Sequence, residues 1–420
     1  MTLATARDVI IVGAGISGIA TAFYLSRANS GLKITLVDAL QPMSFTSAQS
    51  GENYRNWWPS PVMKDFIDQS IDLLEEISAD TENRIRLTQS GYALATRSNS
   101  IDMLLQGLGT DADVINKPKA IRAKFPAFDP EVRNVICIRR AGSLDSYTLS
   151  QHMLGSFRAC GGSVVRGEVS GIEPQSPFRI TLSDGRDLSA TQIVIAAGPF
   201  INWLLAHLGE KLPVANVLQQ KLAFEDVLNA VPLDQPFSVD LDAQQLDWTD
   251  EERDLLADDE QFRFLVDTMP GNAHRRPEGN DHCRWVRLGW AYNTEPSEPG
   301  WSPSLDDHFP EIVLRGAARL NPSLKAYYRE LPAARSHYGG YYTMTEENLP
   351  IIGPLRTEGA FVVSALSGFG TMAACAAGDL CSRWLRGTAL PAHAKPLSLA
   401  RYNDTEFLNS IRLSSERGVL

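Results

Sequence analysis

Cysteine is scarce in this 420-residue chain, and the cysteines follow no recognisable spacing. There are five, an odd number, and no two of them form a C-x-x-C pair or a repeated ligand spacing. The pattern argues against a disulfide framework and favours a reducing compartment, so we expect a cytoplasmic protein. The five are Cys137, Cys160, Cys283, Cys375 and Cys381.

Positive charge is also in short supply. The chain has 39 Lys and Arg against 50 Asp and Glu, which gives a net charge of −11. A phosphate-binding surface needs clustered Lys and Arg, and the sequence contains no basic stripe. We therefore expect no nucleic-acid partner.

Long apolar runs are missing too. The most apolar late stretch, Ala360 to Cys381, is interrupted by three glycines and by Asp379. We therefore predict no integral membrane segment. The first strand begins within ten residues of the N-terminus, so we also expect no cleavable signal peptide.

Histidine-based catalysis and metal binding have little support. Among only seven histidines we find no persuasive Ser/His/Asp triad and no metal cluster, so no metal site is predicted. The length exceeds what a single hydrophobic core usually organises, which favours two domains.

What the chain does contain is a complete nucleotide-binding pattern in its first forty residues. An apolar strand, Asp8 to Val12, leads into a G-x-G-x-x-G sequence, a helical stretch from Ile19 to Arg27, and a second strand from Lys33 to Asp38. A lone glycine triplet is weak evidence, and an ordinary strand-turn-helix with incidental glycines is the alternative. Strand, helix and a carboxylate twenty residues past the last glycine together make the motif strong.

Each residue of the motif has a physical task. Gly13 permits the tight turn, Gly15 lets the backbone approach a pyrophosphate, and Gly18 lets the helix pack closely on the strand. The free N–H groups of the helix N-terminus favour an anion. Asp38 would accept hydrogen bonds from the adenosine ribose and would repel a 2′-phosphate, so FAD or NAD is favoured over NADP.

Periodicity predicts the other elements that matter here. Helical spacing covers Pro61 to Ser78, Ser146 to Ala159 and Leu305 to Leu320, and Cys283 to Tyr292 is strand-like. The apolar run Gln192 to Gly198 is typical of a buried parallel strand whose end lies near a ligand. Residues 240–260 hold ten acidic residues against one Arg, which we interpret as a solvated helix or loop. Further strands are expected at Tyr92 to Thr96, Val135 to Arg139, Ser163 to Arg166, Val169 to Pro174 and Phe178 to Leu182.

Three separated segments resemble the D-amino acid oxidase (DAO) family of flavoproteins, in its sarcosine oxidase and glycine oxidase branch. They are Val9 to Asp38, Val194 to Gly198, and Gly339 to Leu385. The third is the most specific, because Tyr338 to Gly353 is similar to the family's aromatic-glycine stretch before a leucine-proline-isoleucine-isoleucine-glycine run.

The resemblance implies an α/β fold. A Rossmann-type, glutathione-reductase-like FAD-binding domain would be joined to an α+β substrate domain built on an antiparallel sheet. The FAD-binding domain would take residues 1–90, 143–213 and 333–420, and the substrate domain residues 91–142 and 214–332.

The resemblance also implies which residues hold FAD. The first segment would bind the ADP half, Val169 would touch the adenine, and the turn before a late helix would face the flavin's pyrimidine edge, where reduced flavin is negatively charged. A plain helix start is the alternative for that turn. The implied FAD contacts are Gly13, Gly15, Ile16, Ser17, Gly18, Asp38, Ala39, Ser47, Ser50, Gly51, Val169, Ala197, Gly198, Gly340, Gly368, Phe369, Gly370 and Thr371.

Three departures from the family pattern change the expectations. Covalent members have a cysteine in the aromatic-glycine stretch, and Ser336 to Pro350 has none, so we expect noncovalent FAD. Arg287 stands where oxidases of this branch place a lysine beside the flavin. Its charge could support reduced flavin, but oxygen reactivity is in doubt, and a solvent-facing arginine is an equal alternative. Met372 replaces a lysine that some sarcosine oxidases use for the substrate carboxylate.

The predicted substrate site is built around Arg55, the counterpart of a family arginine that grips a substrate carboxylate. A contact with flavin or with a surface acid is the alternative. Tyr54, Tyr341, Tyr342, Trp57 and Trp290 could form an aromatic wall for a cationic amine, although core packing is the commoner role. His337 is the nearest candidate for proton transfer, with a structural hydrogen bond as the alternative.

These observations predict an FAD-dependent enzyme that oxidises a small C–N bond, in a secondary amine or amino acid, by hydride transfer to flavin N5. The electrons would pass to oxygen or to an electron-transfer acceptor. One alternative is oxidation of a 2-hydroxy acid, which a well-placed His337 or His274 would favour. Another is a non-catalytic flavoprotein, either an assembly factor or a subunit of a larger dehydrogenase. An NAD dehydrogenase is disfavoured, because it has no use for the C-terminal return to the nucleotide site.

Overall fold

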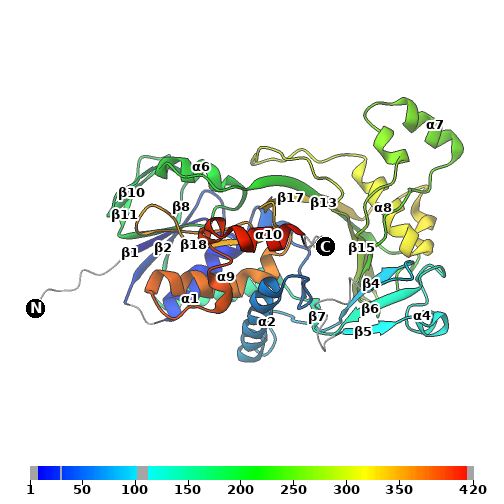
Figure 1. The fold of residues 1–420 in the computed structure, drawn as a ribbon, viewed down its shortest axis with the longest axis horizontal. Coiled ribbons are helices and arrows are strands. Elements are labelled where there is room, and N and C mark those ends of the chain that lie inside the picture. The colour runs from blue at the N-terminus through cyan, green and yellow to red at the C-terminus, as the bar shows by residue number, and fades with distance from the viewer. Residues whose placement is uncertain (1–7, 29–30, 102–111, 414–420) are drawn as a thin grey trace, which may run out of the picture.

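The computed structural model describes residues 8–28, 31–101 and 112–413, which form two parts, each built on a large sheet (Figure 1). The nucleotide-binding pattern lies in the first part, on a six-stranded sheet with the order β18-β19-β12-β1-β2-β8. All neighbours in it are parallel except β18 and β19. The strands are β1 (Asp8–Val12), β2 (Lys33–Asp38), β8 (Ser163–Arg166), β12 (Gln192–Ile195), β18 (Ile351–Pro354) and β19 (Ala360–Ser364).

Both faces of this sheet are covered, which explains its continuous apolar strands. In β1, Val9 and Ile11 pack into the core beneath the helices, whereas Ile10 and Val12 pack into the core on the other face. The helices on the first face are α1 (Ile16–Arg27), α2 (Pro61–Asp80), α5 (Ser146–Ala159) and α9 (Gly370–Arg386). Helix α1, which the sequence predicted from Ile19, begins three residues earlier at Ile16, and Gly15 is its N-cap.

The opposite face packs against a small antiparallel sheet and a short helix. The sheet contains the two strands predicted from Val169 and from Phe178, and its strands are β9 (Val169–Glu173), β10 (Phe178–Leu182) and β11 (Asp187–Ala190). The short helix is α6 (Ile201–Leu205), which follows β12. This arrangement puts the carboxyl ends of β1, β2 and β12 at the same edge, where a ligand is expected in such sheets.

The second part is an eight-stranded sheet with the order β17-β13-β16-β15-β14-β4-β6-β5. Neighbouring strands are antiparallel except β14 and β4. The α/β fold class, with its Rossmann-like nucleotide domain and second sheet, is thereby confirmed. The strands are β4 (Tyr92–Thr96), β5 (Ala112–Ile115), β6 (Asn134–Ile138), β13 (Ala215–Glu225), β14 (Phe237–Asp240), β15 (Ala273–Asn280), β16 (Cys283–Gly289) and β17 (Arg335–Met344).

The two faces of the eight-stranded sheet differ in chemistry. On one face Leu222, Val286 and Leu288 pack beneath α8 (Phe309–Leu320). On the other face Lys221 and Arg287 reach the loop between β2 and β3 (Asn53–Arg55), which belongs to the nucleotide part. Strand alternation therefore directs a row of basic side chains toward the junction of the two parts.

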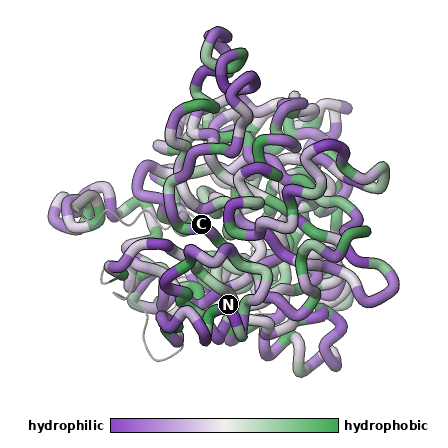
Figure 2. Tube along the Cα trace, turned by 90° about the vertical axis from the view of Figure 1, so that its right-hand side faces the viewer, coloured by the Kyte–Doolittle hydropathy of each residue, from purple (hydrophilic) through white to green (hydrophobic). Residues whose placement is uncertain are grey.

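Helix α8 begins at Phe309 rather than at the predicted Leu305. Pro310 lies in the first turn of α8, where the backbone N–H has no partner within the helix and its absence costs nothing. In a helix that began at Leu305, residue 310 would have to donate its N–H to the Asp306 carbonyl oxygen, and proline has no N–H. The acidic segment forms α7 (Asp250–Asp258), which has no buried residue and projects from the top of the molecule (Figures 1 and 2). The tube is hydrophilic there in Figure 2, in agreement with a solvated helix.

The remaining elements are short. Strand β3 pairs with β7 (Ala141–Ser143), and two further helices are α4 (Pro118–Lys124) and α10 (Thr405–Leu413). The domain boundaries stay a prediction, and β17, which falls in the third predicted FAD-binding range, pairs with β13 in the eight-stranded sheet. Turns of 3-10 helix occur at Thr46–Gln49, Gly198–Phe200, Ala206–Leu208, Arg263–Val266, Pro322–Tyr327, Ala392–Ala394 and Leu399–Asn403.

Candidate active site

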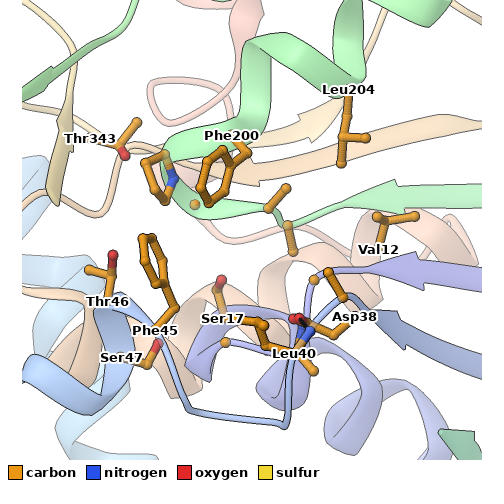
Figure 3. Close-up of a pocket in the computed structure, with 18 of the residues that line it drawn as sticks. Val12, Ser17, Asp38, Leu40, Phe45, Thr46, Ser47, Phe200, Leu204 and Thr343 are labelled. Carbon is orange, nitrogen blue, oxygen red and sulfur yellow. Dashed lines mark hydrogen bonds between the residues drawn. The ribbon is translucent and has the colours of Figure 1, made fainter. Parts of the chain in front are cut away.

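A cavity of about 360 Å³ lies at the carboxyl ends of β1, β2 and β12. It joins residues from both ends of the chain, since Gly13 and Gly370 line it together. Figure 3 shows Ser17, Asp38 and Ser47 on one side of it and Phe200, Leu204 and Thr343 on the other. The predicted residues that line it are Gly13, Gly15, Ile16, Ser17, Asp38, Ala39, Ser47, Val169, Ala197, Gly198, Tyr341 and Gly370.

The N-terminus of α1 is built to receive an anion. Its N-cap, Gly15, has no side chain to bind the first N–H groups, and a Cβ there would lie 3.1 Å from the Ser47 hydroxyl. That hydroxyl accepts a hydrogen bond of 3.0 Å from the Ile16 N–H. Gly13 has φ +108°, and a Cβ on Gly18 would lie 1.9 Å from the Gly13 carbonyl oxygen. Gly18 therefore acts through packing, and the cradle suits the pyrophosphate of a dinucleotide.

Asp38 is held at the end of β2 with its carboxylate at the cavity wall. Its two oxygens accept hydrogen bonds from the backbone N–H groups of Ala14, at 2.5 Å, and Leu40, at 2.8 Å. Burial raises the pKa of this carboxyl, and the two backbone donors oppose that rise. A carboxylate with one donor on each oxygen keeps acceptor capacity for the hydroxyls of an adenosine ribose.

Four aromatic rings close one end of the cavity. Phe45 and Phe200, which face each other in Figure 3, are 5.5 Å apart between ring centroids. The ring of Trp301 lies 4.2 Å from that of Phe200, and the ring of Tyr341 lies 6.2 Å from that of Phe45. The sequence predicted only Tyr341 among the four. Trp301 lies 101 residues after Phe200 and 256 after Phe45 in the sequence, so no spacing could reveal it.

The turn that opens α9 lies beside the loop after β2. The hydroxyls of Ser50 and Thr371 are 2.7 Å apart, although 321 residues separate them. A Cβ on Gly368 would lie 2.4 Å from the ring of Tyr342, and one on Gly340 would lie 3.3 Å from Gln49. Phe369, the N-cap of α9, gives no side-chain hydrogen bond to the helix, so its first N–H groups stay available.

Arg55 is one of the most deeply buried charged residues near this turn. Only 3% of the residue is exposed, and its guanidinium lies 4.4 Å over the ring of Trp58, which in turn lies 5.0 Å from the ring of Phe369. The guanidinium lies beside Tyr92, yet its Nε and Nη2 find no hydrogen-bond partner among the described residues. Burial lowers the pKa of this arginine. The indole N–H groups of Trp57 and Trp58 are also buried without a partner in the described part of the chain.

Lys221 and His274 complete what we call the basic cluster, which consists of Arg55, Lys221 and His274. The Lys221 ammonium donates to the Gln49 carbonyl oxygen at 3.2 Å and lies 5.7 Å from the centre of the Tyr342 ring. Burial, with the charge of Arg287, lowers the pKa of Lys221 to about 8. The sequence analysis missed this residue, because only strand pairing brings it to this face.

His274 lies over Gly289, where a Cβ would meet its Nε2 at 2.3 Å. Its Nδ1 is 3.1 Å from the carbonyl oxygen of Asn272, so Nδ1 donates and Nε2 is left as an acceptor in the neutral ring. Burial, together with the charges of Lys221 and Arg55, lowers the pKa of His274 to about 4, while the hydrogen bond to Asn272 opposes that change. Across residues 8–28, 31–101 and 112–413, no carboxylate forms an ion pair with any member of the basic cluster.

Arg287, unlike the basic cluster, has acidic partners, and it also binds the loop that contains Ser50 and Gly51. It donates to the carbonyl oxygens of Ser50 at 3.2 Å and Gly51 at 3.0 Å, and it forms ion pairs with Glu278 at 2.9 Å and Glu52 at 3.7 Å. It is therefore neither free in solvent nor unpaired. This position links the predicted residues Ser50 and Gly51 to the eight-stranded sheet.

Several predicted residues lie away from the basic cluster. The ring of His337 is stacked on Phe309 of α8, with Nε2 2.8 Å from the Gln220 amide oxygen, on the opposite face of the sheet. The hydroxyl of Tyr54 donates to the Thr88 carbonyl oxygen in the core, and Trp290 donates to Gly271 beneath α8. Tyr341 and Tyr342 leave opposite faces of β17. The structure therefore does not bring the proposed aromatic wall together.

No helix in the described part of the chain is both long enough and apolar enough to cross a membrane. No group of three or more His, Cys, Asp or Glu side chains among the described residues could hold a metal ion.

Comparison with known proteins agrees with the geometry. The profile of the family described as FAD dependent oxidoreductase (DAO) matches residues 8–384. The uncharacterized oxidoreductase YurR of Bacillus subtilis (strain 168) is 23% identical over 236 residues, which are 52% of this chain and 62% of that protein. The match thus spans about three fifths of that relative's length.

Solved structures share the fold. The crystal structure of L-proline dehydrogenase from P. horikoshii superposes with a TM-score of 0.76 at 17% identity, covering 96% of this chain and 99% of that one. Glycine oxidase from Geobacillus kaustophilus gives 0.74 at 18% identity, covering 94% and 99%. Identities this low establish the architecture and leave the substrate to be argued from the site itself.

Proposed function

The chain belongs to the DAO family of FAD dependent oxidoreductases, and we propose that it oxidises a C–N bond in a small amino acid or secondary amine. The observation that carries the proposal is Arg55, a buried guanidinium with two unpaired nitrogens beside the turn that opens α9. A carboxylated amine would give this guanidinium the acceptor that the protein itself does not supply.

The residues that would hold FAD fit its parts. The pyrophosphate would lie against Ser17 and the α1 N-terminus, the ribose against Asp38, and the flavin ring would point toward Gly370 and Thr371. Bound FAD would supply the acceptor for the hydride that leaves the substrate carbon. None of the five cysteines lines the cavity, which supports noncovalent binding.

Arg55 would fix the substrate by its carboxylate through two parallel hydrogen bonds, so that the α-carbon is placed for reaction. Tyr342 and Trp58, whose rings lie near both the cations and the α9 turn, would exclude water from that space. The amine must reach this site neutral, since only its lone pair can expel the hydride. Unpaired positive charge nearby favours the neutral amine.

Arg287 would act by holding the Ser50–Gly51 loop in place beside the site, where its positive charge would add to that of the basic cluster. Its hydrogen bonds to the Ser50 and Gly51 carbonyl oxygens are the contacts that would hold this loop. The electrons would pass on to oxygen or to an electron-transfer acceptor.

The test is an anaerobic panel of methylated amines, amino acids and 2-hydroxy acids, scored by loss of the flavin absorbance of the purified holoenzyme. Amines or amino acids that bear a carboxylate should bleach the flavin. If none of them does, the proposal is wrong. Acid precipitation checks the mode of attachment, because yellow colour left in the pellet would contradict noncovalent FAD.

Oxidation of a 2-hydroxy acid is the second candidate, and His274 is the observation that favours it. Its pKa of about 4 makes it neutral at physiological pH, and its Nε2 is left to accept a proton from an alcohol. Bleaching by hydroxy acids and not by amines would choose this candidate. His274→Gln should then abolish the reaction, whereas it should leave amine oxidation within a few fold.

A further inference from the structure

The basic cluster has more positive charge than one substrate carboxylate can pair with, and we infer that the substrate is a dianion. Its first acidic group would be held by Arg55 and its second by Lys221. This inference rests on the proposed function, since it assumes that Arg55 binds the substrate carboxylate.

Lys221 is a buried cation without an acid. Only 8% of the residue is exposed, and of its three N–H donors one is taken by the Gln49 carbonyl oxygen. Glu278 on β15 and Glu52 in the neighbouring loop are paired with arginines instead. Glu278 lies 2.5 Å from Arg276 and 2.9 Å from Arg287, and Glu52 lies 3.7 Å from Arg287. Buried charges of this kind are normally paired, so an external anion is the missing partner.

Lys221 and Arg55 have the same relation to the reacting centre. The ring of Tyr342 lies close to both Lys221 and Gly368, and the ring of Trp58 lies close to both Arg55 and Phe369. Gly368 and Phe369 are consecutive residues in the turn that would face the flavin. His274 is close enough to both cations for each of them to lower its pKa. One small molecule could therefore reach both cations while its central carbon lies near the turn.

A monocarboxylate would satisfy only half of this arrangement. If it bound Arg55, Lys221 would remain buried and unpaired, and the cost of desolvating its charge would persist. An amino dicarboxylate would pair with both cations, with His274 neutral between them. The groups that face Lys221 from the surrounding elements are Arg287 on β16, His274 on β15, Tyr338 and Tyr342 on β17, and Glu52 in the loop.

The experiment measures binding rather than turnover. Purified holoenzyme is titrated at pH 7 with ligands that cannot be oxidised, and the flavin absorbance is followed. Malonate, succinate and glutarate are each compared with the monocarboxylate of equal length, namely propionate, butyrate and pentanoate. We expect the best dicarboxylate to bind at least about tenfold more tightly than the monocarboxylate of equal length, because it makes one additional charge-assisted hydrogen bond. Lys221→Met should erase this preference, whereas Arg55→Met should weaken both classes of ligand.

Two further variants sharpen the test. Lys221→Arg should retain the preference, and Lys64→Met, which removes a surface lysine paired with Asp68, should leave every constant unchanged. The inference is wrong if the wild-type holoenzyme shows no preference for dicarboxylates, or if Lys221→Met preserves it. It is equally wrong if the only effect of Lys221→Met is a loss of bound FAD, because Lys221 would then serve the cofactor.

Failure here can be told apart from failure of the proposed function. If monocarboxylated amines such as sarcosine bleach the flavin as readily as iminodiacetate, the C–N oxidation stands and the dianion inference fails. If no amine bleaches the flavin while dicarboxylates still bind through Lys221, the anion site stands and the reaction must be sought elsewhere.

Discussion

Two buried arginines in this protein have opposite surroundings. Arg401, near the C-terminal end of the described chain, has a fully buried side chain whose Nε lies 2.6 Å from Glu347. Its Nη1 donates to the Pro350 carbonyl oxygen at 2.6 Å, and its Nη2 donates to the Leu349 carbonyl oxygen at 3.2 Å. Arg55 is almost as deeply buried, yet two of its nitrogens have no partner in the described residues.

The difference separates structural charge from functional charge. Arg401 ties the run before β18 to the C-terminal segment, and every one of its nitrogens is satisfied. Arg315 follows the same rule, with Glu252 and Glu311 both at 2.8 Å. The basic cluster departs from this pattern, as does Arg275 beneath α8, which bonds to Asn321 and Pro236 and has no acidic partner among the described residues. The basic cluster differs from Arg275 in lying beside the turn where a ligand is expected. Unpaired buried charge destabilises a fold, so a protein that keeps it there gains something other than stability.

The largest expected effect is on folding. Arg401→Met should lower the free energy of unfolding by about 3–5 kcal/mol, because it leaves Glu347 buried and unpaired. Arg55→Met should cause no comparable loss, since no acid depends on it. Urea denaturation of both variants measures the contrast. An equal loss in the two would remove the distinction between structural and functional charge.

The next effect is on catalysis. Arg55→Met should lower kcat/KM for a carboxylated amine by about 30-fold or more, since removing one partner of a buried charge pair costs about 2–5 kcal/mol. The loss should appear mainly in KM, and the FAD content should stay unchanged because Arg55 does not line the nucleotide cavity. An unchanged KM would remove Arg55 from the substrate site.

A smaller effect concerns the stability of the apoprotein and its dependence on pH. The pKa of Lys221 falls from 10.5 to about 8 in the folded protein, so the fold disfavours its charged form. The full cost applies below pH 8, where the lysine is charged in both states, and it is relieved as pH rises from about 8 to 10.5. Lys221→Met should therefore stabilise the protein at pH 7, by up to about 3 kcal/mol.

Thermal unfolding of wild type and Lys221→Met across pH 6 to 11 measures this effect. The advantage of the variant should shrink above pH 8 and vanish near pH 10.5. A variant that is less stable than wild type at pH 7 would show that Lys221 has a partner in the fold, which would contradict the unpaired state argued above.

The smallest effect compares two histidines on opposite faces of one sheet. His337 is stacked on Phe309 and bound to Gln220, so His337→Gln should change kcat/KM by less than about twofold, as expected for a residue outside the site. His274→Gln should instead raise KM by a few fold at every pH from 5 to 9, because it replaces a ring that lies near both cations and is already neutral over that range. Steady-state kinetics of both variants from pH 5 to 9 measure the two effects. If His337→Gln lowers kcat/KM more than His274→Gln does, then His337 and not His274 belongs to the site.

Much of the nucleotide half could be predicted from local patterns. Gly13, Gly15, Gly18 and Asp38 lie within one continuous βαβ unit, so the backbone geometry that they require is set by neighbours in sequence. The strands β4, β8 and β10 and the helix α5 have the predicted bounds for the same reason, since their periodicity is local. Helix α8 was predicted four residues too long, although Pro310 marked its true start.

The substrate half could not be predicted in this way. Whether Lys221 or Leu222 faces the junction depends on how β13 pairs with β16 and β17, whose partner residues lie 60 to 120 positions away. The same register placed His337 on the far face, against its predicted role in proton transfer, and it put Tyr341 and Tyr342 on opposite sides.

By itself, then, the sequence determined the dinucleotide-binding pattern with its three glycines and Asp38, because that pattern is formed by one short continuous βαβ unit. Only the tertiary structure decided which charges meet without a counter-ion. That outcome follows from strand register and from the approach of the Gln49–Gly51 loop to the sheet, and neither leaves a signature in the order of residues.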